Sequence, residues 1–357
     1  MIRHAESEGN IYRRAHGQFD GFIIGRGFQQ IERLRERFKD ESINAVYSSD
    51  LSRTCTTAAA IYEPRGLPLN KTERLREVNM GAWEDEPWGN FEYYQPDMVR
   101  YFGSDPARWR IAGSEAYEHV KERMMGCMLD IARAHIGESV AVFSHGFAIR
   151  AFLCEVLGIP SHDAVKLPYC DNTAVALLRF ENGGLSVDYH SDNSHLHKEI
   201  STFANQTWWR GENERVSENM RFMPLDTGRD GELMNRCERE MGAELWADTA
   251  FTAFLADEPA GLVGLDAGGG DGAVTRDAGG GTGRISYIYI KPELRRRNYG
   301  VQLLGQAVSV YRRLRRETLQ IETVGGSPYN NFFLKFGFVK IGGHDSTDIM
   351  EKNIRNW

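Results

Sequence analysis

The chain has 357 residues, a formal net charge of −7 and a mean hydropathy of −0.47. This length allows two domains with separate cores, and the acidic balance argues against nucleic acid as a partner, because binding to the phosphate backbone needs a basic face. No segment approaches the roughly 20 apolar residues of a membrane span and the five cysteines lack C-x-x-C spacing, so we expect a cytoplasmic protein with reduced thiols, no membrane partner and no metal site.

The pair Arg3-His4 stands close to the first residue. A histidine ring can accept a phosphoryl group as a nucleophile, and a neighbouring guanidinium can hold phosphate oxygens with a two-pronged geometry that lysine does not offer. Taken alone, such a pair is more often a solvated surface feature. Arg13 and Arg14 would help to attract a small phosphorylated substrate, although a solvated loop is an equal alternative for them.

A helix, a strand and a second helix follow. The apolar spacing of residues 27–39 predicts an amphipathic helix with Phe28 on its buried side. Residues 43–46 predict a short buried strand, and the Ser/Asp-rich turn after it predicts the cap of a helix with Arg53 in its first turn. Because the helix dipole disfavours a cation there, we expect an anion beside Arg53.

Glu77 lies on a turn-like stretch beside apolar residues, where a raised pKa would let it protonate a leaving alkoxide. The aromatic-rich residues 83–109 predict either a cap over the site, suited to a substrate with an apolar body, or a satellite core. Residues 114–135, opened by Ser114, predict a long helix, and the apolar strand after it places His145 at its carboxyl end, where open α/β sheets bind ligands. Taken singly, Glu77 and His145 also suit a surface carboxylate and a core histidine.

Five residues from these separate motifs occur in an order that resembles the histidine phosphatase superfamily, which includes the cofactor-dependent phosphoglycerate mutases: Arg3, His4, Arg53, Glu77 and His145. The resemblance covers about 200 residues and implies a three-layer α/β fold with a mostly parallel sheet and helices on both faces. It implies that His4 carries the phosphoryl group and that Glu77 donates and accepts the proton. It also implies a set of residues that bind the substrate: Arg3, Asn10, Arg53, His145 and Gly146.

In that family the nucleophile follows a central strand, yet only Met1 and Ile2 precede Arg3. We therefore expect either an unusually short strand or a natural protein that starts several residues upstream. The expected activity is metal-independent hydrolysis of a small phosphomonoester. A phosphoglycerate-type mutase is the alternative, and the arginines within residues 100–110 leave open a site for a second anionic group.

Two further strands, over residues 173–180 and 185–190, close the first half. Residues 201–219 are predicted to be a linker that contains Trp208 and Trp209. Residues 267–283 are rich in glycine and predict a flexible loop between elements.

Residues 285–304 predict a strand, a basic turn and a helix, an arrangement that suits a pyrophosphate. This segment resembles the acetyl-CoA loop of the GNAT acetyltransferase family. Asn298 stands where the family has its first glycine, and asparagine tolerates left-handed backbone better than most residues. The resemblance covers about residues 220–350 and implies that acetyl-CoA binds to Arg295, Arg296, Arg297, Asn298, Tyr299, Gly300 and Val301.

Residues 327–338 predict the last helix of that family. Phe333 stands where the family usually has the tyrosine that protonates the leaving thiolate, and Tyr329, four residues earlier on the same predicted face, is the candidate substitute. Glu322 is a candidate general base, although an ordinary surface carboxylate is the commoner case. A second domain that only binds acetyl-CoA, or that is degenerate, stays open.

The sequence therefore predicts a histidine phosphatase domain at residues 1–200, a linker at 201–219 and a smaller α+β GNAT-like domain at residues 220–357. The predicted partners are a small phosphorylated metabolite and an amine acceptor of unknown identity. A homodimer is left open.

Overall fold

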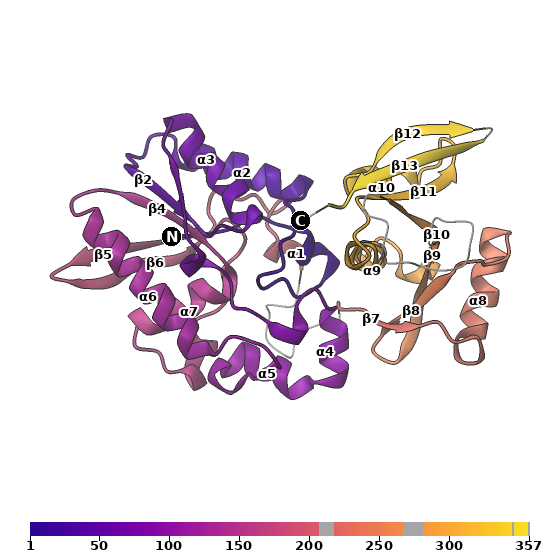
Figure 1. Cartoon of the computed structure of the whole chain (residues 1–357), viewed down its shortest axis with the longest axis horizontal. Coiled ribbons are helices and arrows are strands. Elements are labelled where there is room, and N and C mark those ends of the chain that lie inside the picture. Colours follow the sequence, from indigo (N-terminus) through magenta and orange to yellow (C-terminus); the bar gives the residue numbers. More distant parts are fainter. Residues whose placement is uncertain (207–217, 267–280, 345, 356–357) are drawn as a thin grey trace. The chain divides into compact units, whose positions relative to one another are not determined.

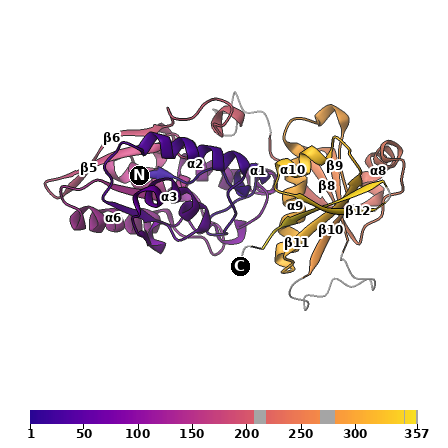
Figure 2. The same ribbon diagram turned by 90° about the horizontal axis from the view of Figure 1, so that it is seen from above.

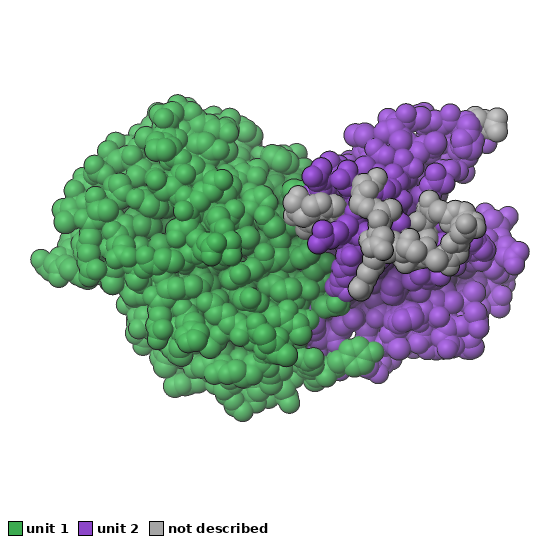
Figure 3. All heavy atoms as spheres, in the orientation of Figure 1, with its two compact units in different colours: residues 1–8, 15–86, 94–216 green, residues 9–14, 87–93, 217–357 purple. Residues whose placement is uncertain are grey.

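The computed structural model describes residues 1–206, 218–266, 281–344 and 346–355. The chain divides into two compact units, coloured separately in Figure 3. Unit 1 comprises residues 1–8, 15–86 and 94–216, and unit 2 comprises residues 9–14, 87–93 and 217–357. The predicted linker tryptophans, Trp208 and Trp209, and most of the glycine-rich segment lie outside the described residues.

The described part of unit 1 contains a six-stranded sheet in the order β3-β2-β4-β1-β5-β6 (Figure 1). Its strands are β1 Ile2–Arg3, β2 Ala45–Ser48, β3 Leu69–Lys71, β4 Val140–Ser144, β5 Val175–Glu181 and β6 Gly184–Asp192. The first four strands of that order pair in parallel, whereas β5 and β6 are antiparallel. The strand expected before His4 is β1, which has two residues in this chain and pairs with a neighbour on each side.

Helices cover both faces of this sheet, with α2 and α3 on one side and α6 and α7 on the other (Figure 1). The helices of the first half, in chain order, are α1 Glu8–Tyr12, α2 Gly25–Phe38, α3 Ser52–Arg65, α4 Trp88–Tyr94, α5 Pro96–Ser104, α6 Tyr117–Ala134 and α7 Gly146–Val156. Leu34 of α2 and Ile61 of α3 pack with Phe143 of β4 in one core cluster. The three-layer architecture is thus confirmed.

The prediction that Phe28 faces the core is wrong, because its side chain is 52% exposed. The close-packed side of α2 runs through Gly27 instead, where an added Cβ would clash with the carbonyl oxygen of Glu6. Because Gly27 has no side chain, the backbone of α2 can approach the backbone of Glu6 closely. With Gly27 facing that neighbour, the following residue, Phe28, points away from it.

Two other details differ from the sequence prediction or decide between its alternatives. Helix α6 begins at Tyr117 rather than Ser114, which forms an isolated bridge with Met80. In the aromatic-rich segment, Trp83 and Trp109 are buried with ring centroids 5.8 Å apart. The structure therefore supports the satellite core for these two side chains.

The described part of unit 2 contains a seven-stranded sheet in the order β12-β13-β11-β10-β9-β8-β7, in which only β10 and β11 pair in parallel. Helix α8 packs on one face and helix α9 on the other (Figures 1 and 2). This is the predicted smaller α+β fold. Its elements are β7 Arg221–Pro224, α8 Thr227–Met241, β8 Thr249–Leu255, β9 Glu258–Asp266, β10 Thr282–Ile290, α9 Tyr299–Arg313, β11 Thr318–Val324, α10 Asn330–Lys335, β12 Val339–His344 and β13 Thr347–Asn353.

Unit 2 also includes two short segments from the first half of the chain, residues 9–14 and 87–93. Arg14 Nη1 donates to Gln306 Oε1 at 2.9 Å, and Arg13 Nε donates to Asn219 Oδ1 at 2.7 Å. Both arginines are buried, so the solvated loop considered for them is wrong.

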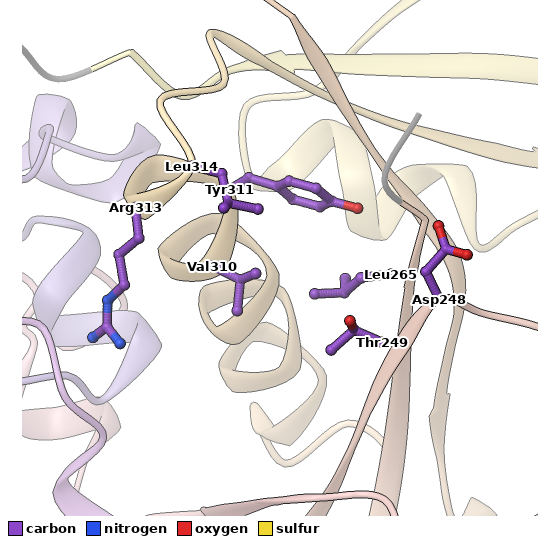
Figure 4. A pocket seen from close by; sticks show the side chains of 7 residues that line it. All are labelled: Asp248, Thr249, Leu265, Val310, Tyr311, Arg313 and Leu314. Atoms are coloured by element: carbon purple, nitrogen blue, oxygen red, sulfur yellow. The ribbon is translucent and has the colours of Figure 1, made fainter. Parts of the chain in front are cut away.

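A pocket of about 280 Å³ lies at the C-terminal end of α9 (Figure 4). The Tyr311 hydroxyl beside it lies 2.6 Å from the carbonyl oxygens of both Asp266 and Arg284 and donates its single proton to one of them at a time. This pocket is at the opposite end of α9 from the predicted acetyl-CoA turn and is therefore not part of it. Its lining residues are Asp248, Thr249, Leu265, Val310, Tyr311, Arg313 and Leu314.

Candidate active site

Strand β1 brings His4 to the carboxyl edge of the sheet in unit 1. The His4 amide donates to the Ser144 carbonyl at 3.0 Å, and Asn172 Nδ2 donates to the His4 carbonyl at 2.8 Å. Ring atom Nδ1 lies 2.8 Å from the carbonyl oxygen of Ala5. Because a carbonyl can only accept, Nδ1 carries the proton and Nε2 keeps its lone pair. Nε2 is therefore the atom of His4 that can attack phosphorus.

Arg53 lies in the first turn of α3, as predicted, and its side chain is buried. Its Nη1 donates to the Phe19 carbonyl at 2.9 Å, and its Nη2 donates to the Gly17 carbonyl at 2.6 Å. The anion expected beside it is Asp20, which lies 3.7 Å from Nη1 and accepts from the Ser52 amide at 2.8 Å. The helix start is thus capped by a carboxylate from another loop rather than by the Ser/Asp-rich turn itself.

Glu77 is held at the start of α7. Its Oε2 accepts from the Phe147 amide at 3.0 Å, and its Oε1 accepts from the amides of Ala148 at 2.8 Å and Val78 at 3.0 Å. Burial raises the pKa of Glu77 above its usual value, although these amides and the Arg53 charge favour the ionised form. The carboxyl group is therefore suited to hold and then release a proton.

His145 and Arg3 present buried polar atoms to the same region. The His145 ring is fully buried with its centroid 5.3 Å from that of His4, and neither of its nitrogens has a hydrogen-bond partner among the described residues. Arg3 Nη1 donates to the Cys170 carbonyl at 2.6 Å, whereas its buried Nε has no partner in the described part of the chain. A Cβ on Gly146 would lie 3.2 Å from that Nε, so glycine makes room for the guanidinium. Unpaired buried donors of this kind suit a bound phosphoryl group.

The two histidines are held in the neutral form. Burial lowers the pKa of His4 well below its usual value, and the charges of Arg53 and Arg3 lower it further. Burial also lowers the pKa of His145 well below its usual value, with Arg53 as the next cause. Near pH 7 His4 therefore has a free lone pair, and neutral His145 still has one N–H to donate.

Sequence reasoning missed Arg123 on α6. Its Nη1 donates to the Arg76 carbonyl at 2.7 Å and its Nη2 to the Glu77 carbonyl at 3.0 Å. The Glu115 carboxylate holds Arg123 in place, 2.6 Å from its Nε. Arg123 thus fixes the backbone that carries the candidate acid, and its position beside Met124 on the apolar side of the predicted helix was the available signal.

The predicted residues of the first domain lie in unit 1, except Asn10, Arg13 and Arg14. The charges of Arg3 and Arg53 lower the pKa of both His4 and His145, and the charge of Arg53 also acts on the pKa of Glu77. These residues therefore lie close to one another. Asn10 lies in α1 and belongs to unit 2. Its role in phosphate binding stays a prediction.

Unit 2 forms the predicted strand, basic turn and helix. Asn298 has φ +63°, so the left-handed conformation expected of it is confirmed. The Asn298 side chain makes no capping hydrogen bond at the start of α9, and the side chains of Arg296 and Arg297 are exposed. Backbone amides at a helix start next to cations fit a pyrophosphate. Arg295 is engaged within the unit, because its Nη2 lies 3.0 Å from a carboxylate oxygen of Glu240.

The remaining residues of this turn contribute through their backbone. Tyr299 and Val301 are buried, and a Cβ on Gly300 would lie 3.3 Å from the ring of Phe332. Their amides belong to the first turn of α9, where a pyrophosphate would bind. The residues of the turn therefore fit the diphosphate part of acetyl-CoA.

The predicted acetyl-transfer residues, Tyr329 and Glu322, both have exposed side chains. Helix α10 spans Asn330–Lys335, shorter than the predicted 327–338, so Tyr329 precedes it. Tyr329 is 61% exposed whereas Phe333 is 3% exposed, and the prediction that they share a helical face is wrong. Glu322 on β11 has a side chain that is 54% exposed, which is the surface-carboxylate alternative.

Other expectations concern cysteines, metals and membranes. All five cysteines are free thiols, and four of them are buried. The described residues contain no cluster of three or more His, Cys, Asp and Glu side chains placed to hold a metal ion. Among the described helices, none combines the length and the apolar character needed to cross a lipid bilayer.

Comparison with known proteins assigns both parts of the chain. The model of the histidine phosphatase superfamily (branch 1) matches residues 1–193, and the model of the acetyltransferase (GNAT) family matches residues 214–338. Phosphoserine phosphatase 1 of Hydrogenobacter thermophilus is 29% identical over 181 residues, which are 51% of this chain and 85% of the relative. A probable phosphoglycerate mutase GpmB of Yersinia pestis is 32% identical over 194 residues, which are 53% of this chain and 83% of the relative.

A solved structure is similar in fold to the first half of the chain. YhfR of Bacillus stearothermophilus is 27% identical to this chain with a TM-score of 0.53, and the match covers 54% of this chain and 96% of YhfR. The superfamily match includes the whole segment from Arg3 to His145. The chain therefore belongs to the histidine phosphatase superfamily, and a GNAT-family acetyltransferase domain follows its phosphatase domain.

Proposed function

We propose that unit 1 is a metal-independent phosphatase that hydrolyses a small phosphomonoester through a phosphohistidine on Nε2 of His4. The observation that carries this proposal is the fixed tautomer of His4, whose Nδ1 bonds to the Ala5 carbonyl. Around it lie buried donors on Arg3 and His145 that have no partner among the described residues. A nucleophile with its lone pair free and buried donors for phosphoryl oxygens are what this reaction requires.

Two displacements complete the reaction. In the first, Nε2 of His4 forms a bond to phosphorus while the bond from phosphorus to the ester oxygen breaks, and Glu77 gives its proton to the leaving alkoxide. In the second, Glu77 takes a proton from a water molecule as the water oxygen attacks phosphorus, and the phosphorus–nitrogen bond breaks. Inorganic phosphate leaves, and both residues return to their first state.

The test is phosphate release from 4-nitrophenyl phosphate in the presence of EDTA. We expect the full chain to be active, His4→Ala to be inactive, and His119→Ala, a matched change at an exposed histidine, to be unaffected. Activity that persists in His4→Ala, or that EDTA abolishes, would overturn the proposal.

The natural ester is suggested by the relatives. The similarity to phosphoserine phosphatase 1 makes phosphoserine the first ester to test, and the similarity to a probable phosphoglycerate mutase makes 3-phosphoglycerate the substrate for the alternative. A phosphatase releases inorganic phosphate from its ester, whereas a mutase converts 3-phosphoglycerate to its isomer without net release. Quantifying both products in one incubation separates the two activities.

We also propose that unit 2 binds acetyl-CoA through residues 295–301. Bound acetyl-CoA would supply an activated acetyl group, and the first-turn amides of α9 with Arg296 and Arg297 would hold its pyrophosphate. Calorimetry of acetyl-CoA with the full chain tests this, and the double variant Arg296→Ala/Arg297→Ala should weaken binding. No binding by the unchanged chain would leave a degenerate domain.

Acetyl transfer by unit 2 is a separate step of this proposal. Its candidate acid and base, Tyr329 and Glu322, both have exposed side chains, so burial does not tune either of them for this step. A domain that binds acetyl-CoA for regulation is therefore the second candidate. Release of free CoA with a panel of amines would support transfer, and binding without release would support regulation.

A further inference from the structure

The Glu84 carboxylate accepts hydrogen bonds from four backbone amides in unit 1. It follows the short 3₁₀ turn Gly81–Trp83, and its Oε1 accepts from Gln18 at 2.8 Å and from Met80 at 2.9 Å. Its Oε2 accepts from Phe19 at 2.9 Å and from Gly17 at 3.2 Å. Three of these amides belong to one loop, residues 17–19. A carboxylate that accepts this many amides is a fixed anchor, because charge-assisted hydrogen bonds are about twice as strong as neutral ones.

The same loop binds Arg53 with its carbonyls. The Gly17 carbonyl accepts from Arg53 Nη2 and the Phe19 carbonyl accepts from Nη1, at 2.6 and 2.9 Å. In the peptide between Gly17 and Gln18, the C=O therefore faces Arg53 while the N–H faces Glu84. Because C=O and N–H of a planar trans peptide point in opposite directions, this one peptide unit connects the carboxylate to the guanidinium.

The loop packs closely against Glu84 at Gly17. A Cβ on Gly17 would clash with the Glu84 carboxylate and with the Val78 carbonyl. At its other end, Asp20 accepts from the Ser52 amide at the start of α3. The loop is thus held at both ends, and a change at one end must be transmitted to its carbonyls.

We propose that Glu84 is a positioning residue for phosphoryl transfer, which acts by fixing the carbonyls of residues 17 and 19 so that the Arg53 guanidinium is held in place beside His4. This inference rests on the proposed phosphatase function of unit 1. A long arginine side chain loses rotamer freedom when it binds a transition state, and a guanidinium held in advance avoids that loss at the moment of reaction. Glu84 itself does not touch the phosphoryl group in this role.

The first variant is Glu84→Gln. The amide is the same size, but its NH₂ group replaces one oxygen and faces two backbone N–H donors, so two of the four hydrogen bonds are lost and the loop moves. Since a misplacement of about 1 Å in an active site can cost on the order of 100-fold, we expect kcat/KM for 4-nitrophenyl phosphate to fall by about 10- to 100-fold. Affinity for orthovanadate should fall in parallel, and Glu63→Gln, at a carboxylate that is 57% exposed, should change neither.

A double-mutant cycle decides whether Glu84 acts through Arg53. The full chain, Glu84→Gln, Arg53→Ala and the double variant are compared in kcat/KM and in orthovanadate affinity. If the proposal holds, Glu84→Gln costs less than about twofold once Arg53 is gone, because the group it positions is absent. Additive losses, or a lower melting temperature with unchanged kcat/KM and unchanged orthovanadate affinity, would overturn it.

Two controls keep this result separate from other failures. If the unchanged chain is inactive or His4→Ala keeps its activity, the phosphatase proposal fails, and the cycle in orthovanadate affinity alone still tests the positioning role. If Glu84→Gln does not fold, Glu84→Asp is used in its place. Aspartate keeps the negative charge, but its shorter side chain cannot reach the amides of residues 17–19 in the same way. In Glu84→Asp the same non-additivity with Arg53→Ala is expected.

Discussion

The imidazole rings of His4 and His145 lie with their centroids 5.3 Å apart and their planes inclined by 56°. Burial lowers the pKa of both, so two neutral rings share the site. Of the two rings, only that of His4 has a nitrogen within hydrogen-bond distance of a carbonyl oxygen in the described part of the chain, which agrees with the proposed roles of His4 as nucleophile and His145 as donor. The two rings can therefore be separated by experiment.

Replacing His145 with asparagine should slow phosphoryl transfer without preventing it. Loss of one donor to a developing oxyanion typically costs about 100- to 1,000-fold in kcat. Labelled phosphoenzyme, trapped by alkaline quench, should still form slowly in His145→Asn and should not form in His4→Asn. Equal labelling of both variants would contradict the roles assigned to the rings.

The rate should depend on pH and on the leaving group. Because the pKa of Glu77 is raised, its protonated fraction falls as pH rises through that value, and kcat/KM for an alkyl ester such as phosphoserine should fall with it. His4 attacks only in its neutral form, so its protonation at low pH should also lower kcat/KM. Because the pKa of His4 is lowered, this loss should occur at pH values well below the usual pKa of histidine.

Glu77→Gln provides the check on this pH profile. For phosphoserine its kcat/KM should be lower by about 100- to 10,000-fold, since general acid catalysis contributes that much. 4-Nitrophenyl phosphate, whose phenolate leaves without a proton, should lose much less. An identical loss for both esters would show that Glu77 is not the acid.

Gly146→Ala should lower activity without lowering stability. The added methyl would lie 3.2 Å from Arg3 Nε, so the guanidinium must shift. Alanine in place of glycine favours the helix by about 1 kcal/mol, so the melting temperature should stay the same or rise. Gly103→Ala on α5, where the methyl meets nothing within 4 Å, is the matched control for kcat/KM. A fall in melting temperature with unchanged kcat/KM would argue against a role in the site.

Asn298 gives a prediction for unit 2. Its φ of +63° costs an ordinary residue about 1–2 kcal/mol, so Asn298→Ala should bind acetyl-CoA about 10-fold more weakly or more. Asn298→Gly removes the same side chain but accepts the conformation, and it should bind as the unchanged chain does. Calorimetry on both variants measures this. If the glycine variant is weakened as much as the alanine variant, the side chain matters rather than the backbone.

The sequence predicted those parts of the molecule that carry a local signal. Periodic apolar residues located α2 and α6, the Ser/Asp-rich turn after a buried strand located α3, and the residue types of Arg3, His4, Arg53, Glu77 and His145 indicated the chemistry. Phe28 and Tyr329 were placed wrongly for a related reason. Helical spacing shows which residues share a face, but tertiary contacts decide how the helix is rotated and where it begins.

The supporting residues could not be predicted. Glu84 and Arg123 act on main-chain amides and carbonyls, which every residue type presents in nearly the same way. Asp20 caps a helix that starts 32 residues later, and no local pattern relates the two. Their roles depend on tertiary contacts, and sequence reasoning reached only the need for an anion beside Arg53.

The peptide between Gly17 and Gln18 connects Glu84 to Arg53 through atoms that mutation of a side chain does not remove. The arrangement therefore requires specific residue types at only a few positions: a glycine at 17, a carboxylate at 84 and an arginine at 53. Phe19 can be replaced without loss of this function by any residue except proline, which has no amide hydrogen to donate.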